Sequence, residues 1–172
     1  MRIKIKEENR TKRIVYSGVI ICIGIIANCF FTIKLPILKM GFGFVPSMLA
    51  AIVFGPLMGA LINGTIDFIS SIIFPVGPYF PGFTMSASIA GIIYGMFLYE
   101  KDINSKSLLK AIILKIIVIN LIINTYWISL LTDKAFIVAL IPRVSRDLIM
   151  IPVKLIVMKT LVHYLSNNEV FT

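Results

Sequence analysis

The sequence predicts an all-α membrane protein, a single domain over residues 1–172 whose six helices cross the bilayer with both termini in the cytosol. Two observations lead to this class. The 172 residues are 58% hydrophobic with a mean hydropathy of +0.96, and long apolar runs alternate with short charged segments, which is typical of a polytopic membrane protein. The net charge of +9 comes largely from residues flanking those runs, where they orient the helices, so we expect no nucleic-acid partner.

The first helix is expected at about residues 14–33. The basic segment 1–13 precedes it and predicts a cytosolic N-terminus. The apolar stretch is long enough to cross the bilayer, so it is not expected to be a cleaved signal. Gly18 and Cys22, one helical turn apart, leave a strip of small side chains where another helix could approach closely. Ordinary packing within the chain is the alternative explanation.

Residues 44–74 form an apolar run that is too long for one span. As a single helix the run would measure about 45 Å, more than the hydrocarbon core. Gly55-Pro56 is a natural break, so we expect helices at 44–54 and 56–74. Further helices are expected at 83–99, 108–131 and 136–165. Lys115, near the inner end of the fifth helix, is expected to extend its side chain to the membrane surface.

The last predicted helix carries charged residues within an apolar sequence. Arg143, Arg146, Asp147 and Lys154 fall on one narrow face at about 100° per residue. Charges at membrane depth are costly unless they face a partner, a water-filled cavity or a ligand. This face therefore marks the candidate site.

Polar residues from other helices converge on the same region. With the predicted topology, Asp67, Asn124 and Trp127 belong to the outer half of the bundle, as do Arg143 and Arg146. The alternative for Asp67 is that it pairs with an arginine of the last helix only to hold the bundle together. For Asn124 and Trp127 the alternatives are interhelical hydrogen bonding and an interfacial position.

The segment from Pro75 to Gly82, PVGPYFPG, is an outer loop rich in proline, glycine and aromatic residues. It predicts either a lid over the site or a rigid turn that places Tyr79 and Phe80 in the aromatic belt of the membrane interface.

The chemistry of these residues points to an anionic ligand with a planar heteroaromatic ring. Guanidinium groups bind carboxylate or phosphate, a carboxylate pairs with the edge of an aminopyrimidine, and aromatic side chains stack on flat rings. No nucleophile–base pair, phosphate-binding glycine loop or cluster with metal-ligand spacing is recognisable in the sequence. We therefore expect no enzymatic activity, no metal and no cofactor, and any pumping must be powered by a partner.

Residues 44–99, followed by NTYWIS and IPRVSRDLIMIPVK, resemble the folate-specific S components of energy-coupling factor (ECF) vitamin transporters. The match is carried by the FGP, FPxGPYFPGFT, NTxW and PRxxRxxIMIP motifs in this order. The resemblance implies a six-helix subunit of the bacterial cell membrane that binds folate from outside. It also implies docking on a transmembrane coupling subunit that is driven by two cytosolic ATPases.

The resemblance also implies roles for individual residues. Asp67 and Asn124 would bind the edge of the pterin ring, and Arg143 and Arg146 would neutralise the glutamate carboxylates. The residues that would stack on the ring or lie next to it are Tyr79, Phe80, Phe83, Thr84 and Trp127. Gly18 and Cys22 occupy the positions of an Ala-x-x-x-Ala docking motif, from which they depart while staying small. Arg146 stands where family members often have lysine, which changes the geometry of the cation.

Three alternatives share parts of this prediction. An S component for another vitamin would have the same fold with a different ligand. A self-contained secondary transporter would need no ATPase partner. A membrane-embedded enzyme would turn over its substrate, although its expected catalytic residues are missing from the sequence.

Overall fold

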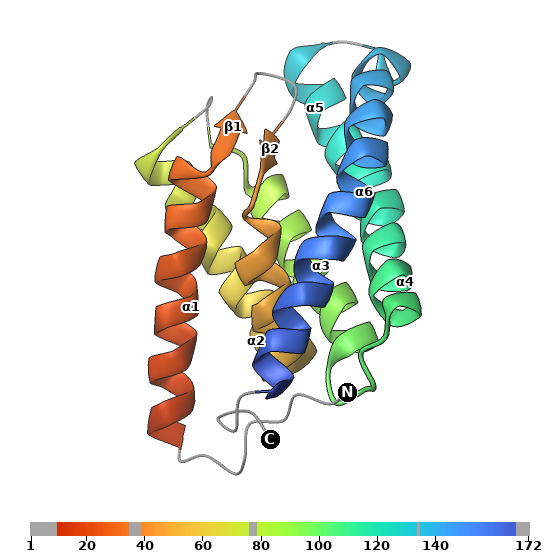
Figure 1. The fold of residues 1–172 in the computed structure, drawn as a ribbon. Coiled ribbons are helices and arrows are strands. Elements are labelled where there is room, and N and C mark those ends of the chain that lie inside the picture. Colours follow the sequence, from red (N-terminus) through yellow and green to blue (C-terminus); the bar gives the residue numbers. More distant parts are fainter. Residues whose placement is uncertain (1–9, 35–38, 76–78, 134, 168–172) are drawn as a thin grey trace.

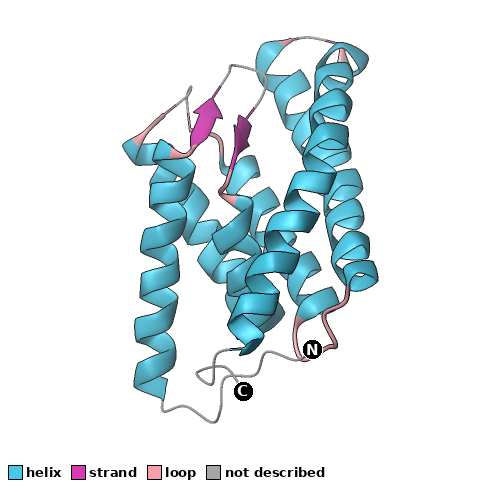
Figure 2. Cartoon of the chain, viewed as in Figure 1, coloured by secondary structure: helices cyan, strands magenta, loops and turns pink. Residues whose placement is uncertain are grey.

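The computed structural model describes residues 10–34, 39–75, 79–133 and 135–167, and within these ranges the chain is a bundle of helices with one small β-hairpin (Figures 1 and 2). Five of the described helices are long and apolar enough to cross a membrane. The chain is therefore built as a multi-pass membrane protein, as the sequence predicts. Most of the basic segment 1–13 lies outside the described residues.

Helix α1 (Arg10–Phe30) leads into an antiparallel pair of short strands, β1 (Thr32–Lys34) and β2 (Lys39–Gly41). Thr32 pairs with Gly41 at the open end of this hairpin. The Phe42 amide extends the pairing by donating to the Phe31 carbonyl at 3.2 Å. Strands of three residues are too short to give a recognisable alternation in the sequence.

Helix α2 (Phe44–Ile73) reverses direction at Gly55, the position at which the sequence predicts a break. Gly55 has φ 84° and ψ −177°, a conformation that is essentially limited to glycine. The Asn63 side chain donates to the Ser47 carbonyl at 3.2 Å, although sixteen residues of straight helix would span about 24 Å. The two arms of α2, residues 44–54 and 56–73, therefore lie side by side and antiparallel.

The remaining helices are α3 (Pro81–Leu98), α4 (Ser105–Lys115), η1 (Ile116–Ile123), α5 (Asn124–Thr132) and α6 (Phe136–Asn167). The helix expected at 108–131 thus begins earlier, at Ser105, and contains an eight-residue π-helical segment, η1, between two α-helical parts. Pro142 and Pro152 both lie inside α6.

Close packing of α2 on α3 fixes the centre of the bundle. A Cβ atom on Gly95 would lie 2.5 Å from the Pro56 backbone, and one on Gly91 would collide with the Gly59 carbonyl. Beside this contact, one buried apolar cluster includes Tyr94 of α3, Ile112 of α4 and Met158 of α6. The backbones can approach this closely because glycine has no side chain.

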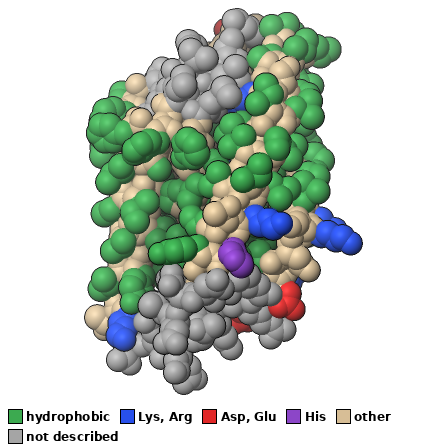
Figure 3. All heavy atoms as spheres, viewed as in Figure 1, with side chains coloured by type: hydrophobic (Ala, Val, Ile, Leu, Met, Phe, Trp, Pro, Cys, Tyr) green, Lys and Arg blue, Asp and Glu red, His purple; other side chains and the backbone are tan. Residues whose placement is uncertain are grey.

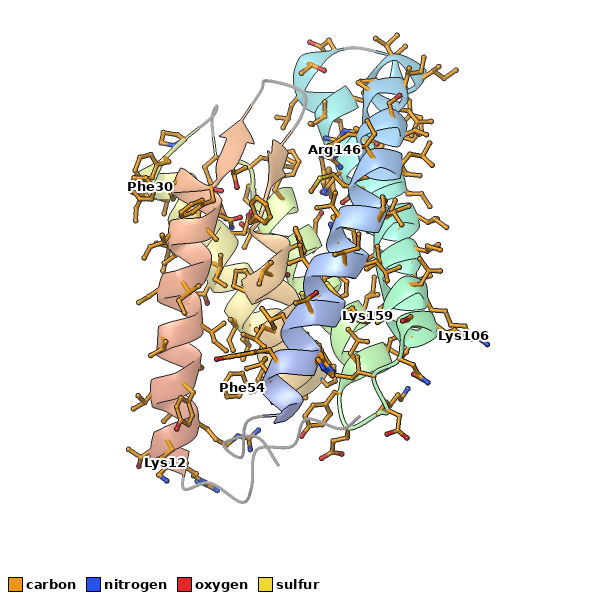
Figure 4. The ribbon with its side chains drawn as sticks, viewed as in Figure 1. Lys12, Phe30, Phe54, Lys106, Arg146 and Lys159 are labelled. Atoms are coloured by element: carbon orange, nitrogen blue, oxygen red, sulfur yellow. The ribbon has the colours of Figure 1, made fainter. Side chains whose placement is uncertain are left out.

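The outer surface is apolar over most of the length of the helices. Figure 3 shows hydrophobic side chains covering the visible face, with basic side chains and the histidine mostly toward its lower part. Lys12 and Lys106 lie near the lower end of the bundle, whereas Arg146 lies in its upper half (Figure 4). The beginning of α1 and the end of α6 lie at the same lower end (Figure 1).

Candidate ligand-binding site

A cavity of about 490 Å³ opens within the bundle, between α2, α3, α6 and the helical segment 105–132. Its size lies within the usual range of small-molecule sites, about 300–1,000 Å³. Polar and charged residues supply much of its wall: Asn28, Thr32, Ser47, Asn63, Asp67, Ser71, Tyr79, Ser86, Tyr94, Lys115, Asn120, Asn124, Thr132, Arg143, Arg146, Asp147 and Lys154. The site that the sequence predicts at α6 therefore coincides with an internal cavity.

The charged face of α6 lines this cavity, as its helical spacing predicts. Asp147 is 2% exposed and accepts two hydrogen bonds from Arg146, from Nη2 at 2.8 Å and Nε at 3.2 Å. Lys154 Nζ lies 3.8 Å from the same carboxylate oxygen. One buried carboxylate thus holds two cations, which leaves positive charge in excess.

Arg143 presents a partly unsatisfied guanidinium group. Its side chain is buried, and Nη1 donates to the Asn120 carbonyl at 3.1 Å. Its Nε has no hydrogen-bond partner within the part of the chain that the structure describes. Because buried donors are normally paired, this atom is suited to an acceptor on a bound ligand.

Segment η1 and its flanks add Lys115, Asn120 and Asn124 to the wall. Lys115 Nζ donates to Asn120 Oδ1 at 2.8 Å, and Asn120 Nδ2 donates to Asp147 Oδ2 at 2.8 Å. The expectation that Lys115 extends to the membrane surface is therefore wrong, because the lysine faces the cavity. Asn124 Oδ1 is buried and has no partner among the described residues.

Asp67 belongs to the part of the cavity wall that α2 supplies. Its Oδ2 accepts a hydrogen bond from the Thr84 hydroxyl at 3.1 Å, and Thr84 in turn shares a hydrogen bond with the Tyr79 hydroxyl at 3.1 Å. No arginine lies within 4.0 Å of Asp67 in the described ranges. The alternative in which Asp67 pairs with an α6 arginine does not describe this structure.

Three of the predicted aromatic residues form one cluster: the Phe80 ring lies 5.2 Å from Trp127 and 5.9 Å from Phe83, both in edge-to-face arrangements. The Tyr79 ring packs instead against Phe68, at 5.5 Å. Tyr79, Phe80 and Phe83 line the cavity, whereas Trp127 is not among its lining residues. The Trp127 Nε1 donor is buried and has no hydrogen-bond partner in the described part of the chain. Residues 76–78 of the predicted lid lie outside the described residues.

The cavity extends along α3, and its wall carries more cations than carboxylates. Phe83 and Tyr94, which both line it, are eleven residues apart on α3, which corresponds to about 16 Å along the helix axis. The lining includes four cations, Lys115, Arg143, Arg146 and Lys154, against the carboxylates of Asp67 and Asp147. The site is therefore suited to an elongated anionic ligand with a planar ring.

The predicted docking positions lie away from this cavity, on α1. The buried residues of α1 are Ile20, Gly24 and Ala27, which face α2, and Gly18 and Cys22 are about 160° around the helix from Ile20. Nothing among the described residues lies within 4 Å of a Cβ atom built on Gly18, and Cys22 is exposed. A small-residue strip is thus open on the outer face of the bundle.

Sequence reasoning missed several residues of the cavity wall. Asn28 of α1 and Asn63 of α2 line the cavity as well. Asn28 reaches the wall because Gly43 carries no side chain there. Asn63 lies four residues before Asp67 and so on the same helix face, and this spacing was the available signal. Lys115 was expected at the membrane surface, although it shares a face of α4 with Leu108 and Ala111, which are buried.

An apolar bundle of membrane-spanning helices around a charged internal cavity defines a membrane protein that binds a small polar molecule. The model for the family "ECF transporter, substrate-specific component" matches residues 12–162, which is most of the chain. The chain belongs to this family. It is therefore a transport component and not an enzyme, as the sequence predicts.

Two characterised relatives and one solved structure support this membership. The chain is 38% identical over 143 residues to the folate transporter FolT of Clostridium novyi, with 83% of each chain covered. It is 30% identical over 147 residues to FolT of Leuconostoc mesenteroides, covering 82% of this chain and 77% of that one. A crystal structure of FolT bound with folic acid superimposes with a TM-score of 0.83 at 32% identity, covering 88% of this chain and 92% of the other.

Proposed function

We propose that this chain is the folate-binding subunit of an ECF-type importer in the bacterial cell membrane. It captures folate from outside and delivers it while docked on a coupling subunit that two separate ATPases drive. The observation that carries the proposal is the internal cavity with more cations than carboxylates, in a chain 38% identical to a folate transporter. Folate combines a flat pterin ring with a glutamate tail that bears two negative charges, and both parts have complementary groups in the cavity.

The pterin ring is proposed to bind beside Asp67. The carboxylate of Asp67, held by Thr84, accepts from the amino-pyrimidine edge, and the unpartnered Asn124 oxygen accepts a further ring N–H. Tyr79, Phe80 and Phe83 line the cavity next to this carboxylate and stack on the ring, while Trp127 packs against Phe80 and Gly82. A planar ring bound in this way is held by dispersion and by directional hydrogen bonds together.

The glutamate tail is proposed to bind to the cations of the cavity wall. Arg143 and Arg146 neutralise its carboxylates, and the unpartnered Nε of Arg143 supplies one of the donors. The stretch of about 16 Å between the lining residues Phe83 and Tyr94 along α3 suits an extended pterin–benzoyl–glutamate molecule.

Binding of folate by the purified chain tests this function. Isothermal titration calorimetry in detergent micelles is expected to give tight one-to-one binding of folate, with riboflavin, thiamine and biotin failing to compete. Mass spectrometry of ligand that co-purifies with the chain is expected to detect a folate. Tight binding of a different vitamin, with no folate binding, would contradict the proposal and indicate an S component of other specificity.

The membrane topology follows from the two arms of α2. We infer six spans, with the arms 44–54 and 56–73 counted separately, and both termini in the cytosol. The beginning of α1 and the end of α6 lie at one end of the bundle, near Lys12 and Lys106 (Figure 4), and basic residues favour the cytosolic side. Folate uptake into liposomes by this chain alone would instead favour a self-contained secondary transporter.

A further inference from the structure

We propose that Lys115 is a ligand-contacting residue that pairs with a glutamate carboxylate of the bound folate in the cavity. This inference rests on the proposed function and deepens it, because it assigns a group for the second negative charge of the tail. Lys115 comes from α4, whereas the two arginines come from α6. The cations of the cavity wall are therefore supplied by two different helices.

The position of Asn120 and Asn124 relative to Lys115 depends on the π-helical segment η1. In a continuous α-helix, residues five apart point about 140° away from each other, and residues nine apart point in opposite directions. A π-helix has i→i+5 hydrogen bonding, which brings residues five apart onto one face. Lys115, Asn120 and Asn124 consequently all line the cavity, and Lys115 reaches the Asn120 side chain at 2.8 Å.

π-Helical segments are rare and are frequently found at functional sites. Lys115 itself is the last residue of the regular helix α4, seven residues after the buried Leu108 and four after the buried Ala111, so α-helical periodicity turns it inward. Segment η1, which follows it, keeps Asn120 and Asn124 on the same wall of the cavity.

The cation of Lys115 has no anionic partner within the described residues. Its hydrogen bond goes to the neutral amide of Asn120, and no carboxylate oxygen of the described chain lies within 4.0 Å of Nζ. Asp147 is already engaged by Arg146 and Asn120. An ammonium group carries three donors, and a carboxylate entering the cavity can accept from those that Asn120 does not use.

Buried cations near one another repel unless an anion joins them. Lys115, Arg146 and Lys154 surround the single carboxylate of Asp147, directly or through Asn120. This excess of charge is compensated when the ligand carboxylate binds, so the contact is expected to favour the anionic ligand strongly over a neutral one.

The test compares folate with pteroate, which has the same ring system and lacks the glutamate. Lys115→Gln removes the charge while its amide can still donate to Asn120. By calorimetry on the purified chain in detergent, Lys115→Gln is expected to weaken folate binding by roughly 30-fold or more, the usual scale for losing a buried charge pair. Pteroate affinity is expected to change by less than about threefold, because distant, independent contributions are additive.

Two control variants make the outcome specific. Lys115→Arg keeps a cation and is expected to retain most of the folate affinity. Lys110→Gln, on the exposed side of α4, is expected to bind both ligands as the unaltered chain does. Retained pteroate binding shows that Lys115→Gln is folded.

Equal loss of folate and pteroate in Lys115→Gln would overturn the assignment, as would unchanged folate binding. If Lys115→Gln does not fold, Lys115→Met provides the test. Loss of the preference for folate over pteroate in Lys115→Met would support the assignment, and a retained preference would overturn it. Failure of the unaltered chain to bind folate would overturn the proposed function itself, and with it this inference. The failures of the two proposals are therefore distinguishable.

Discussion

Asp147 and Asp67 are both carboxylates in the cavity wall, and their surroundings give them different roles. Asp147 is buried between Arg146, Lys154 and Asn120. Asp67 is half-buried and receives only a neutral hydroxyl, that of Thr84, among the contacts described for it. A buried carboxylate that holds two cations is structural, whereas one with a single neutral donor remains available to a ligand.

Asp147→Asn is expected to destabilise the protein, and Asp67→Asn to weaken binding. Losing the Asp147 charge leaves Arg146 and Lys154 uncompensated, at a cost of about 3–5 kcal/mol for a broken buried pair. Thermal unfolding in detergent is expected to show a large loss for Asp147→Asn and little change for Asp67→Asn. Folate calorimetry on Asp67→Asn is expected to show the loss of affinity. An equal loss of stability in both variants would contradict this division of roles.

Arg143→Ala is expected to reduce folate affinity severely. The guanidinium is buried and keeps one donor without a partner among the described residues, so truncation removes a charged donor from the ligand, at a cost of about 2–5 kcal/mol. Calorimetry with folate measures the effect. Lys159→Ala, on an exposed part of the same helix α6, is the matched control. Unchanged affinity in Arg143→Ala would remove this residue from the site.

At the scale of helices, the reversal of α2 depends on one residue. Gly55 has φ 84° with extended ψ, and side chains in this region cost about 1–3 kcal/mol. Gly55→Ala is therefore expected to lower the midpoint of thermal unfolding. Gly18→Ala, at an open position of regular helix, is the control and is expected to stabilise slightly because alanine favours helix. The same midpoint for Gly55→Ala and the unaltered chain would contradict the reasoning.

Helical periodicity predicts part of this site and fails at a definite place. Arg143, Arg146 and Lys154 could be assigned to one face because α6 is a continuous helix. Lys115 shares a face of α4 with the buried Leu108 and Ala111. The face on which Asn120 and Asn124 fall relative to it could not be predicted, because η1 shifts the angular register of the chain by an amount that the sequence does not reveal. The break at Gly55 was predictable from Gly-Pro chemistry and from length, since a single helix would exceed the membrane. The hairpin of β1 and β2 was too short to leave a pattern.

At the scale of the whole molecule, α1 has two different faces. Ile20, Gly24 and Ala27 are buried against the bundle, while Gly18 and Cys22 lie on the open side. A helix of a partner subunit could pack closely along such a strip of small residues. Because the strip is separate from the cavity, docking and ligand binding can be perturbed independently.

Gly18→Trp is expected to abolish docking and preserve folate binding. The indole would fill the space that a partner helix needs, so co-purification with the coupling subunit and folate uptake by the assembled transporter are expected to be lost. Folate affinity of the isolated chain is expected to change by no more than about twofold, as for a surface substitution. Val19→Trp, at an exposed neighbouring position, is the control. Normal uptake in Gly18→Trp would move the docking surface elsewhere.

The location of Trp127 gives the chain an intrinsic optical probe. The sequence contains one tryptophan, and its ring packs against Phe80 at the edge of the cavity. All indole emission from unlabelled protein therefore originates at this wall. Stopped-flow mixing with folate would record, without a dye, how fast the aromatic wall responds to an arriving molecule, separately from any later movement of α1.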